Sequence, residues 1–405
     1  MAFRIVSADT ATPVSPDSGD IIIVKTGAVV SSAGDGIAGF SATNLTAYID
    51  GIVAGQDNGG EFGGGANVSI GQNGALLGLS CGLWLNGTGS VVQNSGTIQS
   101  LGTGPSFIDA AIALNVATNV AITNSGDVIG SGIAVDLTSS TGTTVVNLGT
   151  VSAGAAAFTG FAGLSIDNLG TILSSMQAAF DFTWSTTGVL NIRNSGLISS
   201  PVTAIRGSDT LGDVVVNSGR IVGDVDLGAG AAVDKVINSG VIDGNVYLGG
   251  AADIYRGSSE GTVTGTVFGG GGGDNLMGGY GDDTLDGEAS NDVLNGRRGD
   301  DVLFGGAGDD TLNGGADDDV LTGGSGNDRF VFRGNFGYDI ITDFDAANTE
   351  KIDLRGVSTI TDFADLQANH LRISGPNVLI DAGDGNVIVL QNFDVAGLQA
   401  ADFVF

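Results

Sequence analysis

The sequence predicts an all-β protein made of stacked parallel coils, with three regions along its 405 residues. A loose repeat of 21 to 30 residues runs through residues 1–268, and a strict repeat of nine residues runs through residues 269–331. Residues 332–405 keep neither period. Repeats of these lengths, rich in glycine and β-branched residues, are typical of solenoids. We therefore expect an N-terminal parallel β-helix that continues into a parallel β-roll and ends in a C-terminal β cap.

The long repeat of residues 1–268 has the core V-x-N-S-G-x-I. Clear copies are VVQNSGTIQS (91–100), NIRNSGLISS (191–200) and VVNSGRIVG (215–223). The typical interval of 21–24 residues accommodates three short strands and three turns, so the aligned glycines indicate about eleven coils. These glycines are Gly27, Gly51, Gly74, Gly96, Gly126, Gly149, Gly170, Gly196, Gly219, Gly240 and Gly261.

An asparagine recurs at the turn of the long repeat. The clear copies place it at Asn94, Asn124, Asn147, Asn168, Asn194, Asn217 and Asn238. Asparagine tolerates a left-handed backbone and hydrogen-bonds nearby main-chain groups, and stacked asparagines can also bond one another along the solenoid. Ligand binding is the alternative, but a residue that recurs with the fold favours a structural ladder.

The short repeat places an aspartate sixth and a bulky apolar residue eighth in every unit. Its seven units begin at Gly269, Gly278, Gly287, Gly296, Gly305, Gly314 and Gly323. The aspartates are Asp274, Asp283, Asp292, Asp301, Asp310, Asp319 and Asp328. If two units make one coil of 18 residues, alternate units stack. One column then holds Asp274, Asp292, Asp310 and Asp328, and the other holds Asp283, Asp301 and Asp319.

These residue types predict calcium sites between the stacked turns. Glycines allow a backbone that turns its carbonyls inward, and the aspartate adds a charged oxygen. Calcium accepts six to eight such oxygens in a flexible geometry. The expected carbonyl ligands lie near Gly270, Gly272, Gly279, Gly281, Gly299, Gly306, Gly308, Gly324 and Gly326. Two columns of this length have five internal gaps, so we expect about five or more ions.

The nonapeptides resemble the G-G-x-G-x-D-x-U-x repeat of RTX proteins over residues 269–331. The resemblance implies a calcium-binding parallel β-roll. Some units depart from the pattern, with Glu288 and Ser290, Arg297, and Asp317 in glycine positions, and we expect weaker or distorted sites beside them. A flexible glycine–aspartate linker would not keep leucine in register, and a phosphate-binding loop would require a lysine that is absent.

The charge of the chain supports a cation-dependent fold. The net charge is −31, and residues 269–331 contain 14 acidic and only 3 basic side chains. Without cations such a segment repels itself, and with calcium the binding energy becomes folding energy. So acidic a protein is not expected to bind nucleic acid. The single cysteine, Cys81, rules out an intrachain disulfide, and no run of 18 apolar residues predicts a membrane span.

Residues 332–405 resemble the segment that follows the nonapeptides in calcium-dependent secreted proteases and related RTX exoproteins. The residues that carry this similarity are Asp343-Phe344-Asp345, Lys351-Ile352-Asp353-Leu354 and Asp402-Phe403-Val404-Phe405. The resemblance implies a cap on the roll, an uncleaved signal for type I secretion machinery and an extracellular or cell-surface location. The start of the sequence has no basic-then-apolar export segment, which agrees with this route.

The sequence favours a scaffold over an enzyme. Some alginate epimerases join a parallel β-helix to RTX modules, so an epimerase- or lyase-like enzyme acting on uronans is the alternative. The only histidine, His370, is expected on the surface of the cap. Asp209 with Asp213, or Asp224 with Asp226, offer acid pairs, which are interpreted as solvent-facing turn residues.

The predicted function is therefore that of a secreted, calcium-dependent structural or adhesive protein of the extracellular matrix or cell surface. Polysaccharide, a cell surface or further copies of the chain, as in a surface layer, are the expected partners besides calcium. Six aromatic residues mark either contact loops or core positions, and the sequence leaves this choice open. They are Trp84, Phe158, Phe161, Phe180, Phe182 and Trp184.

Overall fold

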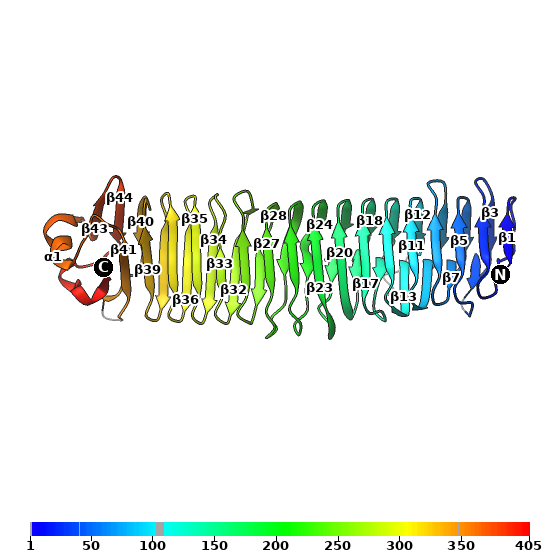
Figure 1. Ribbon diagram of the computed structural model, residues 1–405, viewed down its shortest axis with the longest axis horizontal. Coiled ribbons are helices and arrows are strands. Elements are labelled where there is room, and N and C mark those ends of the chain that lie inside the picture. The colour runs from blue at the N-terminus through cyan, green and yellow to red at the C-terminus, as the bar shows by residue number, and fades with distance from the viewer. Residues whose placement is uncertain (1, 40, 103–108, 347–348) are drawn as a thin grey trace. The chain divides into compact units, whose positions relative to one another are not determined.

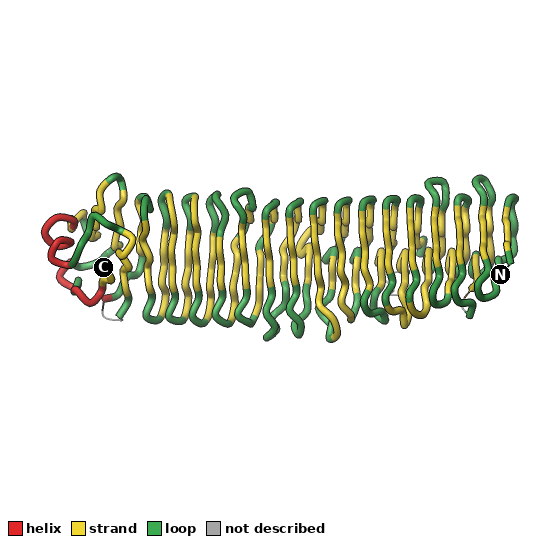
Figure 2. Tube along the Cα trace, viewed as in Figure 1, coloured by secondary structure: helices red, strands yellow, loops and turns green. Residues whose placement is uncertain are grey.

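The computed structural model describes residues 2–39, 41–102, 109–346 and 349–405. The chain divides into two compact units, Met1–Val225 and Asp226–Phe405. Each unit is a stack of parallel strands joined by short turns (Figure 1), and strands and turns alternate along the trace of each (Figure 2). The predicted all-β parallel solenoid is confirmed. No helix among the described residues has the length and apolar character needed to cross a membrane.

The strands of the first unit form two sets of parallel neighbours, here called its sheet A and sheet B. Sheet A contains β1 (Phe3–Val6), β2 (Ile21–Val24), β5 (Thr46–Ile49), β8 (Asn67–Ile70), β11 (Val91–Asn94), β14 (Ala121–Asn124), β17 (Thr143–Asn147), β20 (Ala162–Asn168), β23 (Thr187–Asn194) and β25 (Val214–Asn217). Sheet B contains β3 (Val29–Ser32), β4 (Ile37–Gly39), β6 (Ile52–Gly55), β7 (Asn58–Phe62), β9 (Ala75–Gly78), β10 (Cys81–Thr88), β12 (Thr97–Ser100), β13 (Ala110–Thr118), β15 (Asp127–Gly130), β16 (Ile133–Asp136), β18 (Thr150–Ala153), β19 (Phe158–Thr159), β21 (Thr171–Ser174), β22 (Phe180–Asp181) and β24 (Leu197–Arg206). The strand β26 (Arg220–Asp226) ends at the boundary between the units.

A coil of the first unit passes once through sheet A and twice through sheet B, as β14, β15 and β16 do in succession. Apolar side chains face inward in register from coil to coil. Val128 pairs with Val151, and Val151 pairs with Ile172, all of them at most 1% exposed. Such in-register stacking makes the core continuous along the unit, because each coil covers the apolar side chains of its neighbour.

The asparagine ladder predicted for this unit is present from Asn94 to Asn217. Each side-chain amide nitrogen donates to the amide oxygen of the next coil's asparagine, at distances of 2.7 to 2.9 Å. All of these side chains are buried, at 0–1% exposure. Two positions later, a Cβ on Gly149 would lie 2.1 Å from the carbonyl oxygen of Gly126 in the preceding coil. Only glycine fits that close approach, which explains why the motif reads N-x-G.

The second unit has the same kind of construction with a different coil. Its sheet A contains β27 (Lys235–Asn238), β30 (Ile254–Gly257), β33 (Asn275–Met277), β35 (Val293–Arg298), β37 (Thr311–Ala316), β39 (Arg329–Arg333), β41 (Lys351–Gly356) and β45 (Phe403–Val404). Its sheet B contains β28 (Val241–Asp243), β29 (Val246–Gly249), β31 (Thr262–Val263), β32 (Thr266–Gly271), β34 (Thr284–Ala289), β36 (Val302–Ala307), β38 (Val320–Ser325), β40 (Tyr338–Ile341), β42 (Leu371–Ser374), β43 (Asn377–Gly383) and β44 (Asn386–Leu390).

The nonapeptides of this unit pair at a distance of two repeats. Leu285 on β34 pairs with Leu303 on β36, and Leu294 on β35 pairs with Leu312 on β37. Each nonapeptide leucine is at most 1% exposed. One nonapeptide thus contributes a strand to one sheet and the next contributes a strand to the other, so the predicted coil of 18 residues is what the pairing shows.

The end of the second unit closes both of its sheets. On sheet B, β40 pairs with β44 of an antiparallel meander of β42, β43 and β44. On sheet A, β41 pairs with the short strand β45. The sequence predicted no helix, but a helical segment made of α1 (Phe363–Asp365) and η2 (Leu366–His370) lies between β41 and β42 along the chain. The single turns η3 (Val395–Gly397) and η4 (Ala400–Asp402) follow β44.

One buried carboxylate in this cap has its own cations. Asp353, at 0% side-chain exposure, lies 2.6 Å from Arg355, 3.1 Å from Arg329 and 3.5 Å from Arg333. The hydrogen bond from the Arg355 side chain, together with the charges of the arginines, lowers the pKa of Asp353 to about 2. The strand β39 of the last nonapeptide is thereby tied to β41 of the cap.

Candidate metal centre

The seven nonapeptide aspartates stand in the two predicted columns. Each lies directly before an inward-facing strand and is at most 5% exposed. In the first column, the Oδ1 atoms of Asp292, Asp310 and Asp328 each accept the backbone N–H of the aspartate 18 residues earlier, at 2.7 to 2.9 Å. In the second column, Asp301 and Asp319 accept in the same way from Asp283 and Asp301. One carboxylate oxygen of each pair is therefore used to fasten coil to coil.

The second oxygen of these carboxylates has no hydrogen-bond partner among the described residues. This applies to the buried Oδ2 atoms of Asp274, Asp292, Asp301, Asp310, Asp319 and Asp328. A buried carboxylate oxygen without a donor is costly, since it has lost its water and gained nothing. Six repetitions of one costly arrangement indicate a missing positive partner rather than a local accident.

The glycine that opens each nonapeptide makes room for this oxygen. A Cβ on Gly287 would lie 2.3 Å from Oδ2 of Asp292, and one on Gly314 would lie 2.1 Å from Oδ2 of Asp319. In the nonapeptides, glycine at position 1 therefore lets the aspartate fold back over the start of its own turn. The sequence spacing of five residues between glycine and aspartate has this steric origin.

In six of the seven nonapeptide turns, positions 2 and 4 take a left-handed backbone whether or not they are glycine. The φ angles of the glycines there are between +95° and +145°, at Gly270, Gly272, Gly299, Gly306, Gly308, Gly315, Gly324 and Gly326. The substituted positions keep a positive φ: Glu288 at 64°, Ser290 at 88°, Arg297 at 86° and Asp317 at 83°. The fold thus imposes the turn on residues that dislike it, at a cost on the order of 1 kcal/mol each.

The carbonyls of these turns are directed into the gaps between coils. A Cβ on Gly306 would lie 2.2 Å from the carbonyl oxygen of Glu288, and one on Gly308 would lie 2.3 Å from that of Ser290. From the other side of the same gap, the carbonyl oxygen of Gly305 comes within 2.6 Å of a Cβ placed on Gly287. Together with Oδ2 of Asp292, this gap therefore collects oxygens from both coils.

Burial raises the pKa of these carboxyl groups. The pKa of Asp310 rises to about 6, those of Asp274 and Asp319 to about 7, and those of Asp292 and Asp301 to about 8. The pKa values of Asp283 and Asp328 rise as well, again chiefly through burial. The charges of neighbouring aspartates add to the effect, as those of Asp274 and Asp310 do at Asp292. A cation in the gap would reverse both causes.

The donor set fits calcium. Within the described ranges, no three His, Cys, Asp or Glu side chains converge, because each coil supplies one carboxylate per column. The other ligands would have to be backbone carbonyls, and such a mixture of hard oxygens in a flexible turn suits calcium. Zinc and other softer metals, which prefer sulfur and imidazole ligands, are not matched by this set.

The turn 278–283 differs from the other six. Neither Gly279 nor Gly281, both predicted carbonyl positions, is left-handed. The backbone N–H of Gly279 donates to Oδ2 of Asp283 at 2.6 Å, so this oxygen has a partner. The Arg297 guanidinium donates to the carbonyls of Gly257 at 3.2 Å and Gly278 at 3.4 Å. The distortion predicted beside Arg297 therefore lies in the turn one coil earlier.

Three acidic residues outside the nonapeptide period continue the columns. Asp253 accepts the N–H of Asp234 at 2.7 Å, and its own N–H donates to Asp274 at 2.7 Å. At the other end, Oδ1 of Asp339 accepts the N–H of Asp319 at 3.0 Å, and Glu350 precedes β41 as Asp328 precedes β39. Their spacings to the next aspartate are 20 to 22 residues rather than 18, so the nine-residue rule did not find them.

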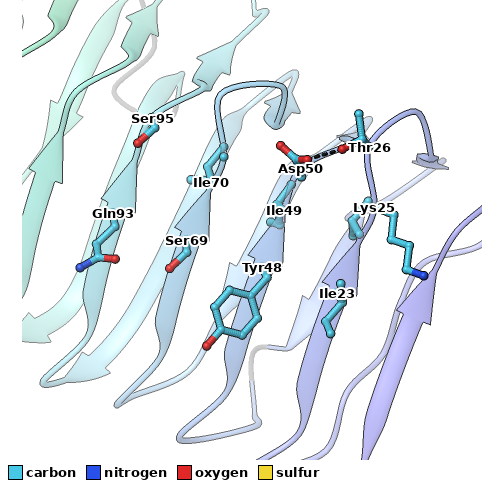
Figure 3. A pocket seen from close by; sticks show the side chains of 12 residues that line it. Ile23, Lys25, Thr26, Tyr48, Ile49, Asp50, Ser69, Ile70, Gln93 and Ser95 are labelled. Atoms are coloured by element: carbon cyan, nitrogen blue, oxygen red, sulfur yellow. Dashed lines mark hydrogen bonds between the residues drawn. The ribbon is translucent and has the colours of Figure 1, made fainter.

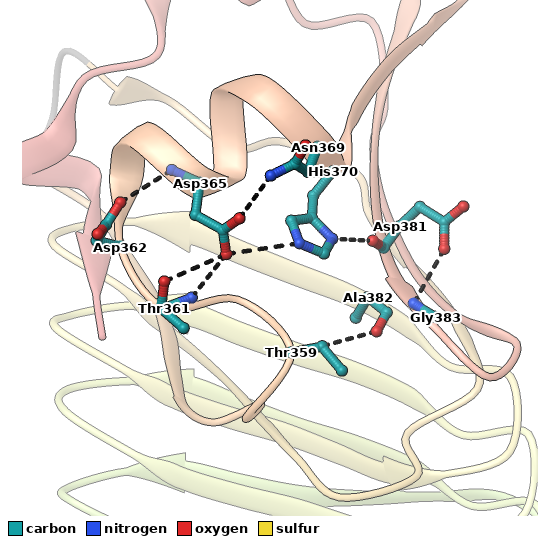
Figure 4. A network of polar contacts seen from close by, with 9 residues as sticks. All are labelled: Thr359, Thr361, Asp362, Asp365, Asn369, His370, Asp381, Ala382 and Gly383. Carbon is teal, nitrogen blue, oxygen red and sulfur yellow. Dashed lines mark hydrogen bonds and ion pairs between the residues drawn. The ribbon is translucent and has the colours of Figure 1, made fainter.

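His370 lies inside a polar network, where a surface position was predicted (Figure 4). Its side chain is only 15% exposed, and Nδ1 lies 2.6 Å from the carbonyl oxygen of Asp381 while Nε2 lies 3.6 Å from Oδ2 of Asp365. The same Asp365 carboxylate accepts from the N–H of Thr361 at 3.0 Å and from the Asn369 amide at 2.8 Å. The network joins the helical segment to β43, which gives the histidine a structural role.

The proposed acid pairs of the first unit are likewise corrected at Asp213. This residue is 0% exposed and its two oxygens accept the N–H groups of Leu190 and Ser208 at 2.7 and 2.8 Å. It is therefore not a solvent-facing turn residue. Both oxygens fasten backbone, which explains a buried acid without assigning it any chemistry.

The grooves on the described part of the first unit include a shallower one on sheet A and a larger one on sheet B. The shallower one, of about 650 Å³, crosses neighbouring strands and is lined by Lys25, Tyr48 and the hydrogen-bonded pair Thr26 and Asp50 (Figure 3). The larger one, of about 820 Å³, is lined among others by Asp136, Asp181, Gln177, Phe161 and Trp184.

The larger groove answers the question left open for the aromatic residues. Phe158, Phe180 and Phe182 are buried in the core, with Phe158 stacked on Phe180 at 5.1 Å between ring centroids. By contrast, Phe161 is 46% exposed and Trp184 is 74% exposed at the groove. Only these last two aromatic side chains are therefore placed to contact a ligand there.

Comparison with known families agrees with the geometry of the turns. The family model of the RTX calcium-binding nonapeptide repeat, which spans four copies, matches residues 268–303 and 297–330. A search of the curated proteins finds no match. The matched residues carry six buried carboxylate oxygens without partners, on a parallel β-solenoid. The chain thus carries RTX calcium-binding nonapeptide repeats in residues 268–330, and these repeats form part of a parallel β-solenoid.

Proposed function

We propose that this chain is a secreted, calcium-dependent structural or adhesive protein of the extracellular matrix or cell surface. The observation that carries the calcium dependence is the row of buried Oδ2 atoms without partners in the two aspartate columns. We also retain the division into a β-helix of residues 1–268, a roll of residues 269–331 and a cap with a secretion signal in residues 332–405 as part of this proposal.

The proposed ligands are the nonapeptide aspartates and the carbonyls at positions 1, 2 and 4 of their turns. Asp283 belongs to the distorted turn, and its Oδ2 already accepts from the N–H of Gly279, so its site is expected to be the weakest. A calcium ion in a gap supplies the positive charge that the paired carboxylates lack. The chain's own residues then hold the coils in register through the Oδ1 hydrogen bonds.

Calcium dependence also suggests how export and folding are separated. Cytosolic calcium is scarce, so the acidic repeats stay loose there and suit passage through type I secretion machinery. Outside the cell, calcium at millimolar concentration is enough for extracellular sites, whose dissociation constants are on the order of 10⁻⁴–10⁻³ M. The long acidic run and the cap that closes both sheets of the second unit support this sequence of events.

The larger groove of the first unit supports the adhesive part of the proposal. An exposed tryptophan and an exposed phenylalanine offer flat apolar faces to a sugar ring. Asp136, Asp181 and Gln177 offer acceptors and donors for hydroxyl groups beside them. Two carboxylates make the groove unsuited to a polyuronate, so a neutral polysaccharide is the ligand that we propose.

The same groove is the place where an enzyme would have to act. Asp136 and Asp181 stand two rungs apart, because both pair in register with Thr159 on the intervening strand β19. Rungs are spaced by about 4.8 Å, so their backbones are separated by about 10 Å. Burial raises the pKa of Asp136, as a general acid requires. A carbohydrate-active enzyme therefore remains the second candidate.

Titration calorimetry with calcium tests the proposed cation sites. We expect Asp292→Asn to bind fewer ions than the parent protein, because Asp292 lies between two neighbours of its column. The matched control is Asp127→Asn, which removes the same charge from an exposed strand position of the first unit. Equal calcium uptake by all three proteins would disprove the proposed ligands.

Glycan binding tests the adhesive part separately. Calcium-loaded protein is incubated with neutral polysaccharides and with alginate and pectin, and retention is compared between parent, Trp184→Ala and the control Tyr48→Ala. We expect Trp184→Ala to lose binding to a neutral chain and Tyr48→Ala, 50% exposed on another face, to keep it. New reducing or unsaturated ends would favour the enzyme, and no retention of any glycan would exclude the groove as a binding site.

A further inference from the structure

The turn 248–253 lies outside the nonapeptides but shares several features of their turns. With Asp253 as position 6, Gly249 occupies position 2. Leu248 at position 1 and Ala251 at position 4 stand where the nonapeptide pattern has glycine, and Ala251 is not left-handed. Gly249 is left-handed at a φ of +125°, as position 2 is in the nonapeptide turns that bind the next coil. Tyr255, fully buried at position 8, takes the place of the leucine and pairs with Leu276.

The oxygens of this turn converge on the next gap in the same way. A Cβ on Gly270 would lie 1.9 Å from the carbonyl oxygen of Gly249, and one on Gly272 would lie 2.3 Å from that of Ala251. The corresponding distances in the nonapeptide gap after Glu288 and Ser290 are 2.2 and 2.3 Å. The carbonyls therefore point toward the coil of Asp274 as nonapeptide carbonyls point toward theirs.

The carboxylate of Asp253 completes the likeness. Its Oδ1 accepts the N–H of Asp234, its N–H donates to Oδ1 of Asp274, and its Oδ2 is buried without a partner among the described residues. The whole residue is 1% exposed. Asp292 has the same pattern: one carboxylate oxygen accepts a hydrogen bond from the neighbouring coil, and the other has no partner among the described residues.

The opposite situation holds at Asp283, which does belong to a nonapeptide. Its Oδ2 is already an acceptor for Gly279, and its turn lacks the two left-handed positions. The guanidinium of Arg297 donates to the carbonyl of Gly278 in the same turn. The guanidinium also donates to the carbonyl of Gly257, so this fixed cation lies on the side of the turn that faces away from Asp301 and holds the turn in its distorted form.

We propose that the calcium array is displaced from the nonapeptide run: an ion lies between the turns of Asp253 and Asp274, and none lies between the turns of Asp283 and Asp301, because Arg297 holds the turn of Asp283 in a form that does not bind calcium. This inference rests on the proposed function, since it assumes that the aspartate columns bind calcium. In the column of Asp274, bound calcium then begins one coil before the nonapeptides, at Asp253. In the column of Asp283, bound calcium begins one coil later than the nonapeptides, at Asp301.

Counting bound calcium in matched variants tests the displacement. Parent protein, Asp253→Asn, Asp283→Asn, Asp292→Asn and the control Asp127→Asn are dialysed against millimolar calcium, and the calcium per chain is measured by mass spectrometry. We expect Asp253→Asn to hold one ion fewer than the parent, and Asp283→Asn to hold the same number. The pattern of nine residues alone predicts the reverse result for both variants.

A fifth variant tests the role of Arg297 without threatening the fold. Arg297→Gly removes the guanidinium and relieves a positive φ of 86°, and we expect it to bind one ion more than the parent. In the parent itself, terbium replaces calcium, and excitation of tyrosine should give sensitised emission that Tyr255→Phe weakens. This second measurement needs no change at Asp253, so it decides the matter even if Asp253→Asn does not fold.

The outcomes separate the inference from the proposal on which it rests. Unchanged calcium in Asp253→Asn together with unchanged terbium emission in Tyr255→Phe overturns the upstream site. A lost ion in Asp283→Asn, or no gain in Arg297→Gly, overturns the part of the inference that concerns Asp283 and Arg297. If Asp292→Asn also keeps its full calcium content, the aspartate columns do not bind calcium and the proposed function itself fails.

Discussion

The asparagine ladder of the first unit and the aspartate columns of the second are the same device built from two side chains. Both place one buried residue per coil at a turn, and both reach from one coil to the next. The amide of asparagine carries a donor and an acceptor, so each rung satisfies its neighbour. The carboxylate of aspartate carries acceptors only, and among the described residues one oxygen of every nonapeptide aspartate except Asp283 has no hydrogen-bond partner.

The choice between an amide and a carboxylate at the turn thus decides whether the solenoid needs a cation. A neutral ladder is complete once the chain has coiled, since its hydrogen bonds need no third party. An acidic column gathers like charges in a region that excludes water, and it is destabilised until a cation enters. The first unit should therefore fold without calcium, whereas the folding of the second unit should depend on the calcium concentration of its medium.

Removing calcium should have the largest effect on this contrast. With a chelator, we expect the nonapeptide coils of the second unit to lose protection against hydrogen exchange, while the asparagine-bearing coils of the first unit keep theirs. Circular dichroism should show a matching partial loss of strand signal. Equal protection of both units with and without calcium would remove the distinction altogether.

Replacing one asparagine of the ladder by aspartate should introduce an uncompensated buried carboxylate, as in the columns, into the first unit. Asn147→Asp loses the donor to Asn168 and buries a charge with no cation, which should cost about 3–5 kcal/mol. Asn147→Ala, as control, should cost about 1–3 kcal/mol for the unsatisfied partners alone. Denaturant unfolding of the first unit measures both, and a smaller loss for the aspartate variant would contradict the argument.

A carboxylate that has its own cations should behave unlike the columns. We expect Asp353→Asn to cost about 2–3 kcal/mol, because three arginines would lose their partner while remaining partly exposed. The folded-state pKa of Asp353 is lowered, so its contribution is present above pH 3.8 and is lost as the pH falls toward about 2. The loss in Asp353→Asn should be the same with and without calcium in urea titrations of the second unit.

The pH dependence of the calcium-free protein should have the opposite sign. The pKa values of Asp292 and Asp301 are raised to about 8 in the folded state, so protons bind the folded form more tightly than the unfolded form. Stability from these groups is therefore complete below pH 3.8 and is lost as the pH rises through about 8. In chelator, the second unit should melt higher at pH 5 than at pH 9, whereas calcium-loaded protein should not show this decline.

The smallest effect is expected from neutralising one rung of a column. In chelator, Asp292→Asn should raise the unfolding free energy of the second unit by about 1 kcal/mol, because a neutral amide removes one buried like charge. In calcium the same variant should be less stable than the parent. A variant that is less stable in both media would show that Asp292 serves only its hydrogen bonds.

The repeats themselves made most of this architecture predictable. A leucine every nine residues fixed the 18-residue coil, and the period of the asparagines fixed the ladder, because each is set by local geometry. The nine-residue period did not predict Asp253 and Asp339, because their coils are longer than 18 residues. The D-x-apolar pattern of Asp253-Ile254-Tyr255 was nevertheless present. The interactions of Arg297 and His370 reach across coils or between elements, and no local pattern encodes them.

The alternation of nonapeptides between the two sheets limits how such a protein can change its length. Adding a pair of units would insert one complete coil, and everything downstream would meet the same sheet as before. Adding a single unit would exchange the sheets, so that β40 and β41 of the cap would each face the wrong edge. Growth or loss of this array by duplication is thus expected to proceed in even numbers.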